Sequence, residues 1–175
     1  MITVEILRKI CPFSFSSTIK PFVDPLNNLI PQYHINTTLR IRHFIAQISH
    51  ESGEFKYVKE LASGQAYEGR KDLGNTHPGD GVMFKGRGLI QITGRNNYLI
   101  LSKDIFGDQR LIDHPELLEQ PENAVLSACW FWEKNGLNKL ADNDDIKSIT
   151  KKINGGYNGL SDRVVYYERT KKYII

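Results

Sequence analysis

The chain has 175 residues, which is enough for one domain with a buried core. Apolar residues make up 40% and charged residues 25%, close to the globular average, so a disordered or fibrous chain is excluded. The net charge of +3 comes from 23 basic and 20 acidic residues scattered along the sequence, whereas a nucleic-acid-binding protein usually carries a clustered basic stripe. We therefore expect a single domain over 1–175 that binds no nucleic acid.

The N-terminal segment predicts neither a signal peptide nor a membrane anchor. Glu5 and Arg8 interrupt residues 1–9, and no stretch of about 18 apolar residues occurs anywhere. We expect a monomer made in the cytoplasm, without membrane insertion. It would need a separate pore or export system to reach an outside substrate. Cys11 and Cys129 give no disulfide framework; a buried free thiol is favoured for Cys129, and whether the two pair stays open.

The first thirty residues are punctuated by prolines, which predicts short helices broken by turns. An amphipathic helix should follow. Residues 36–38 offer N-cap side chains, and apolar residues of 41–48 repeat at spacings of three and four. Glu51 continues that apolar face, and Gly53 is a plausible end of the helix.

The middle of the chain is rich in turn-forming residues. Gly, Asp, Asn and Pro over 63–88 predict a long loop or a short hairpin, and loops of this length are often functional. Residues 89–93 form a β-prone run between Gly88 and Gly94, which predicts a strand or an extended segment.

Helical signals dominate the last third of the chain. Pro121 suits the first turn of a helix that ends before Gly136. Asp144 or Asp145 can cap a further helix that runs through Ile153, and a last helix should begin near 161–162. The predicted fold class is α+β, mainly α, with one small β or loop region.

Glu51 is the first candidate for chemistry. A carboxyl on or beside the apolar face of a helix is partly desolvated, which raises its pKa. A carboxylic acid that is still protonated near neutral pH can protonate a glycosidic oxygen. On helix geometry alone, a surface glutamate without a role is the more common outcome at such a position.

A second carboxylate is needed to activate water in an inverting glycosidase, about 6.5–9.5 Å from the first. Glu60 lies nine residues beyond Glu51, and a chain reversal between them could set that gap. Glu54 and Glu68 are alternatives by position, and the sequence leaves the choice open.

Metal and nucleotide motifs are incomplete. His50-Glu51 lacks the second histidine of a zinc protease, because Glu54 stands at that position. The segment 86–88 lacks the remainder of a dinucleotide or phosphate-binding loop, and 142–145 lacks the glycine and distal glutamate of a calcium loop. We expect no metal and no cofactor.

Several segments, in order, resemble glycoside hydrolase family 19, which contains plant-type chitinases and phage or prophage endolysins. The matching segments are Ile48-Ser49-His50-Glu51-Ser52-Gly53, Phe84 to Thr93, Asn96-Asn97-Tyr98, Trp130-Phe131-Trp132, Ile153-Asn154-Gly155-Gly156 and Asp162-Arg163. Together they span roughly positions 40 to 170, most of the chain.

The resemblance implies a lysozyme-like fold of two lobes around a central cleft, and an inverting mechanism. Glu51 would be the general acid, Glu60 the general base, and Thr93 would hold the attacking water. Residues that would line the cleft or support its carboxylates are Gln91, Asn97, Asn154 and Arg163. Further candidates for substrate contact are His50, Tyr67 and Glu68. Rings that could stack on sugars are Tyr67, Phe84 and Tyr98.

Two departures bear on the substrate. The chain lacks the many cysteines of plant chitinases, and its 67–70 and 74–81 segments resemble the endolysin branch. The expected activity is therefore cleavage of the β-1,4 bond between N-acetylmuramic acid and N-acetylglucosamine in peptidoglycan. Chitin is the alternative substrate, and a non-catalytic glycan-binding module is the alternative of another class.

Overall fold

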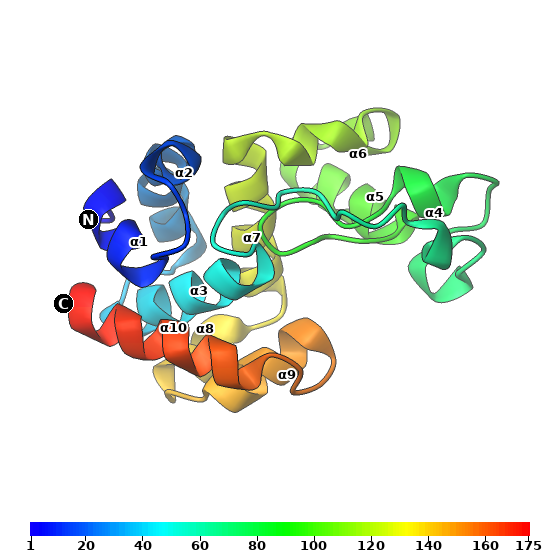
Figure 1. Cartoon of the computed structure of the whole chain (residues 1–175). Helices are drawn as coiled ribbons and strands as arrows, with labels where there is room; N and C mark the ends of the chain where they lie inside the picture. The colour runs from blue at the N-terminus through cyan, green and yellow to red at the C-terminus, as the bar shows by residue number, and fades with distance from the viewer.

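The computed structural model describes all 175 residues and consists of helices joined by loops (Figure 1). The α-helices are α1 (Val4–Ile10), α2 (Ser16–Leu29), α3 (Thr38–Glu51), α4 (Asp80–Met83), α5 (Arg95–Phe106), α6 (Arg110–Asp113), α7 (Pro121–Lys134), α8 (Leu137–Asp142), α9 (Ile146–Asn154) and α10 (Leu160–Tyr173). Four 3₁₀ helices lie between them: η1 (Ile30–Tyr33), η2 (Gln65–Tyr67), η3 (Lys71–Leu73) and η4 (Pro115–Glu119). The mainly helical fold class is confirmed.

The predicted helix signals sit where the helices begin. The Thr37 hydroxyl accepts a hydrogen bond from the backbone N–H of Arg40 at 3.3 Å and caps α3. Pro121 occupies the first turn of α7, and Asp145 caps α9 by accepting from the Ser148 N–H at 3.0 Å. Each cap satisfies a donor that the first turn of a helix leaves free.

Two local predictions are wrong. Residues 89–93 form a tight turn rather than a strand, with Gln91 at φ +57° and reciprocal backbone hydrogen bonds of 2.8 and 3.1 Å between Arg87 and Ile92. The run is too short to pair with anything beyond its own loop. In the N-terminal region, α2 continues through Pro21 and Pro25, because the buried face of Ile19, Phe22 and Leu26 holds the helix together.

The core is one cluster of 34 buried apolar residues. Helix α3 packs along α10, and α2 packs against α7. Phe44 of α3 meets Trp132 of α7 edge to face, with ring centroids 5.3 Å apart. Cys11 and Cys129 are both buried and free, which answers the question of their pairing.

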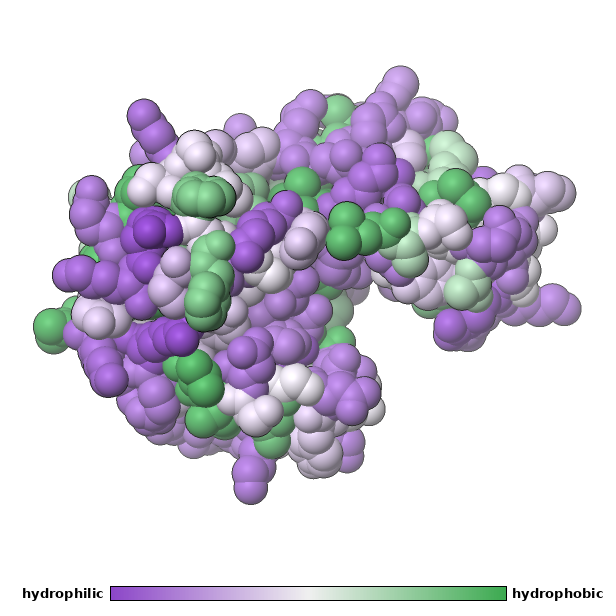
Figure 2. Space-filling model, viewed as in Figure 1, coloured by the Kyte–Doolittle hydropathy of each residue, from purple (hydrophilic) through white to green (hydrophobic).

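An arm formed by residues 58–113 extends from this helical body and carries α4, α5 and α6 (Figure 1). Arg87 anchors the loops of the arm: its side chain donates to Glu119 at 2.8 Å and to the carbonyl of Met83 at 2.7 Å. Figure 2 shows a deep notch between this arm and the part of the body that carries α9. No helix combines the length and apolar character that a membrane crossing requires.

Candidate functional site

Glu51 is the last residue of α3, and its side chain is 18% exposed. One carboxylate oxygen accepts a hydrogen bond from Nη2 of Arg163, a residue of α10 that is 1% exposed. Nη1 of Arg163 donates to Oε1 of Gln47, one helical turn before Glu51 on α3. The packing of α3 on α10 therefore joins one carboxylate and one amide through a single guanidinium.

Glu54 has no access to a substrate. It is 2% exposed, and its carboxylate accepts hydrogen bonds from the Phe13 N–H at 2.8 Å and the Tyr166 hydroxyl at 3.1 Å. These contacts fix the turn between α1 and α2 onto the end of α3. Glu54 is thus a structural carboxylate, and it drops out as a candidate for the second acid or base.

Glu60 is held on both sides by the loops of the arm. Its backbone N–H donates to the carbonyl of Gly86 at 2.9 Å, and its Oε2 accepts from the Gly86 N–H at 3.0 Å. Its Oε1 accepts from the Tyr67 hydroxyl at 3.0 Å. Burial and this hydrogen bond raise the pKa of Tyr67, so the phenol stays a donor. One lone pair on each oxygen of Glu60 remains for water.

Glu68 is engaged in holding a loop. One of its oxygens accepts from the Gly79 N–H at 2.7 Å and the other from the Gly81 N–H at 2.8 Å, at the start of α4. Both oxygens are therefore committed to backbone. By number of hydrogen bonds, Glu60 and Glu68 are equally engaged, with one bond on each oxygen. Glu60 stays the second carboxylate that the family resemblance predicts.

Two of the three aromatic candidates are unavailable for stacking on a sugar. Phe84 and Tyr98 are completely buried and pack against each other, with ring centroids 5.3 Å apart. The expectation that they face substrate is wrong, because both rings form the core of the arm. Tyr67 is partly exposed and acts on Glu60 through its hydroxyl.

Gln91, Thr93 and Asn97 line one cavity of about 360 Å³. The cavity lies where the arm meets α7 and the end of α9. Trp130 and Phe131 of α7 and Ile153 of α9 line it. The Thr93 hydroxyl donates to the Gln91 carbonyl at 2.9 Å, and the Asn97 amide donates to the Thr93 carbonyl at 2.7 Å. These bonds fix the turn of 91–93 and leave the lone pairs of the Thr93 hydroxyl free.

His50 of α3 and Asn154 of α9 both contact the segment that leads from α9 into α10. Nδ1 of His50 pairs with Asp162 at 2.6 Å, and any side chain at Gly159 would collide with the His50 ring. Asn154, the last residue of α9, donates to the carbonyl of Asn158 at 3.3 Å. The loop between α9 and α10 thus rests on the end of α3 beside Glu51.

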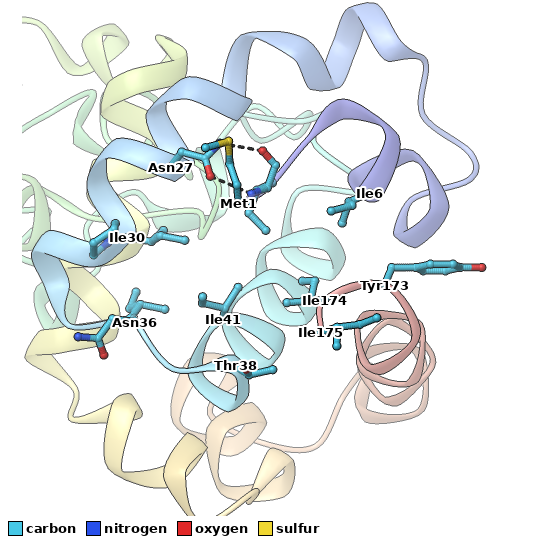
Figure 3. A pocket seen from close by; sticks show the side chains of 13 residues that line it. Met1, Ile6, Asn27, Ile30, Asn36, Thr38, Ile41, Tyr173, Ile174 and Ile175 are labelled. Carbon is cyan, nitrogen blue, oxygen red and sulfur yellow. Dashed lines mark hydrogen bonds between the residues drawn. The ribbon is translucent and has the colours of Figure 1, made fainter.

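A larger cavity, of about 590 Å³, lies elsewhere. Figure 3 shows it between the two chain termini and α3, lined mostly by apolar side chains such as Ile6, Ile41 and Ile174. Its lining includes no Asp, Glu, His, Lys, Arg or Cys side chain. No group of three or more His, Cys, Asp or Glu side chains is placed to hold a metal ion.

Sequence reasoning missed Gln47 and the structural role of Glu54, which it named only as an alternative second carboxylate. Gln47 is completely buried and contacts Arg163, and Glu54 holds the turn behind Glu51. Gln47 had a detectable signal, because residues four apart share a helix face and Gln47 precedes Glu51 by four. The role of Glu54 depends on a contact 41 residues away and had none.

No family model matches the chain. A glycosyl hydrolase family 19 domain-containing protein of Haemophilus influenzae is 30% identical over 155 residues, covering 71% of this chain and 74% of that protein. An endochitinase of Arabidopsis thaliana is 37% identical over 117 residues, covering 66% of this chain and 39% of the endochitinase. The chain thus spans less than half the length of that plant relative.

Solved structures share the fold. Chitinase C of Streptomyces griseus has a TM-score of 0.77 at 20% identity, covering 99% of this chain and 92% of that one. A class IV chitinase of Zea mays has a TM-score of 0.73 at 22% identity, with the same coverage. Because 99% of the chain is covered in each case, both likenesses include the arm and the body.

Proposed function

The chain belongs to glycoside hydrolase family 19, and from this premise we propose that it is an inverting hydrolase of β-1,4 bonds in peptidoglycan. The observation that carries the proposal is the pair of carboxylates held in different ways. Glu51 touches a buried arginine, and Glu60 is fixed by Gly86 and Tyr67. We assign Glu51 as general acid and Glu60 as general base.

In the proposed first event, Glu51 gives its proton to the bridging oxygen between two sugars. The bond to the anomeric carbon then breaks, and Glu51 is left as a carboxylate. Arg163, already in contact with Glu51, stabilises that charge as it forms.

The attacking water is assigned to Glu60 and Thr93. The Thr93 hydroxyl donates to the Gln91 carbonyl, so it can only accept from a water molecule. Such a water has its second proton free for Glu60, and its lone pair free for the anomeric carbon. Attack from the face opposite the leaving oxygen inverts the configuration, and the proton ends on Glu60.

Peptidoglycan is the favoured substrate for two reasons. The loops of 67–70 and 74–81 resemble endolysins, and the net charge of +3 suits an anionic polymer. Chitin is the second candidate, supported by the similarity to plant endochitinases. In the first case we propose that the protein reaches the cell wall through a separate pore or export system and acts there as a monomer.

The acid is tested by Glu51→Gln, which keeps the shape of the side chain but cannot supply a proton. We expect lysis of purified walls to fall by about 10²–10⁴-fold while binding to the walls persists. Unchanged lysis would remove Glu51 from the mechanism. A wild-type protein that binds walls but never cleaves them would support a glycan-binding module instead.

The substrate is tested with two gels, one containing purified peptidoglycan and one containing colloidal chitin. Clearing of the peptidoglycan gel by wild-type protein, and not by Glu51→Gln, is the expected result. Clearing of chitin alone would replace peptidoglycan by chitin and leave the assignment of Glu51 intact.

A further inference from the structure

Gln47 is a buried polar side chain that the proposed chemistry does not use. It lies on α3 one turn before Glu51 and is completely buried. Its Oε1 accepts from Nη1 of Arg163, and its Nε2 lies 3.5 Å from the hydroxyl of Thr150 on α9. Gln47 therefore stands between α9 and α10 at the point where both approach Glu51.

Arg163 has more donors than partners. Its Nη1 serves Gln47 and its Nη2 serves Glu51, while its buried Nε has no partner at all. An arginine fork can hold one carboxylate with two parallel hydrogen bonds, a stronger arrangement than one bond. Gln47 already accepts from Nη1 of Arg163, the nitrogen that could otherwise make a second hydrogen bond to Glu51.

Whether Arg163 makes one or two hydrogen bonds to Glu51 matters if Glu51 is a general acid. An arginine close to a carboxylate favours its ionised form, and a general acid must be protonated before it reacts. Because the neutral amide of Gln47 engages Nη1 of Arg163, the guanidinium stays near Glu51 without binding both of its carboxylate oxygens. The remaining charges beside Glu51 are the His50–Asp162 pair, whereas Glu54 points to Phe13 and Tyr166.

We propose that Gln47 is a positioning residue that restricts Arg163 to a single contact with Glu51. Glu51 can then carry a proton before the reaction and has a cation beside it afterwards. This inference rests on the proposed function. The neutral amide of Gln47 holds the Arg163 guanidinium in position. Changing the charge of residue 47 should therefore change the pH range in which the enzyme is active.

The test compares pH–activity profiles of Gln47→Leu and Gln47→Glu with that of the wild type. Gln47→Leu frees Nη1 to join Glu51, so the alkaline limb should move to lower pH by about one unit, with kcat reduced more than KM is raised. Gln47→Glu adds a negative charge and keeps an oxygen that can accept the hydrogen bond from Nη1 of Arg163. Its alkaline limb should move to higher pH, and its kcat at the optimum should recover relative to Gln47→Leu.

Ser49→Ala is the matched control, since Ser49 is also buried on α3 and hydrogen-bonded, but contacts Cys11 and the Ile45 carbonyl instead. It should lower the melting temperature without moving the alkaline limb. Limbs that stay in place, or move together, in the folded Gln47 variants would overturn the inference. An inactive wild-type enzyme would instead contradict the proposed function.

Discussion

At the scale of single residues, burial separates the candidate carboxylates. Each oxygen of Glu54, Glu60 and Glu68 accepts one hydrogen bond from a backbone N–H or a tyrosine hydroxyl. Glu54 is 2% exposed, whereas Glu60 and Glu68 are partly exposed and keep lone pairs that water can reach. Glu51 instead has an ion-pair contact with Arg163. Burial thus removes Glu54 from the candidates, and Glu60 remains the proposed base.

Thr93 gives a prediction at this scale. Thr93→Val keeps the shape of the side chain and removes the hydroxyl that would hold the attacking water. Steady-state kinetics should show kcat reduced by about 10²-fold with KM almost unchanged, because the contacts with the sugars remain. Thr93→Ser keeps the hydroxyl and should retain most of the activity. Equal losses in the two variants would mean that the hydroxyl does not position water.

At the scale of elements, α3 and the loops of the arm each contribute one half of the site. Helix α3 carries Gln47, His50 and Glu51 within two turns, and its packing on α10 supplies Arg163. The arm supplies Glu60 and Thr93 from loops that pair only through isolated bridges around Arg87. A regular helix therefore positions the proposed acid, and irregular backbone positions the proposed base.

Gly86 gives a prediction for the loop element. A Cβ at this position would lie 2.7 Å from Oε1 of Gln91 and 3.3 Å from Oε2 of Glu60. The flexible end of Gln91 can move aside, so Gly86→Ala should change the melting temperature little. The displaced groups belong to the site, and kcat/KM should fall by about 10-fold or more, because small misplacements are costly in catalysis.

Gly107, at the end of α5, is the matched control for that glycine. It has φ +74° and open space around it. Gly107→Ala should therefore lower the melting temperature through backbone strain and leave activity per folded molecule unchanged. Full activity of Gly86→Ala would show that the loop tolerates displacement of Gln91.

At the scale of the whole molecule, buried ionisable groups make the free energy of unfolding depend on pH. Burial lowers the pKa of His43, although a hydrogen bond from its ring to Asp144 at 2.8 Å opposes that effect. The other ring nitrogen has no partner, and the ring stacks on Tyr167. In the arm, the hydrogen bond from Arg95 lowers the pKa of Asp80 to about 2.

The direction of the pH dependence follows from these shifts. The unfolded chain protonates His43 near pH 6.5, while the native state resists the proton, so the free energy of unfolding should fall as pH drops below about 6.5. Asp80 should add a second loss as pH falls from its ordinary value near 3.8 towards 2.

Thermal melts between pH 7 and 5 check the first of these losses. His43→Phe keeps a ring on Tyr167 and removes the titrating group, so it should flatten the dependence of the melting temperature on pH. His114→Gln, at an exposed position, should leave it as in the wild type. An unchanged slope in His43→Phe would assign the loss to other groups.

The amino-acid sequence by itself determined the positions of α3, α7, α9 and α10, because apolar periodicity and capping residues are local signals. The ordered motifs also determined the family and made Glu51 the leading candidate for the acid. A short apolar run carries no local signal of what it pairs with. Residues 89–93 were therefore expected to form a strand or an extended segment from their β propensity alone, and instead they form a turn.

Only the tertiary structure decided how the candidate groups are used. Arg163 reaches Glu51 across 112 residues, and Glu54 reaches Phe13 across 41. Phe84 and Tyr98 are apolar enough for either a core or a sugar platform, and burial in the arm selects the core. Such contacts depend on how helices pack, and packing of distant segments leaves no periodic trace in the sequence.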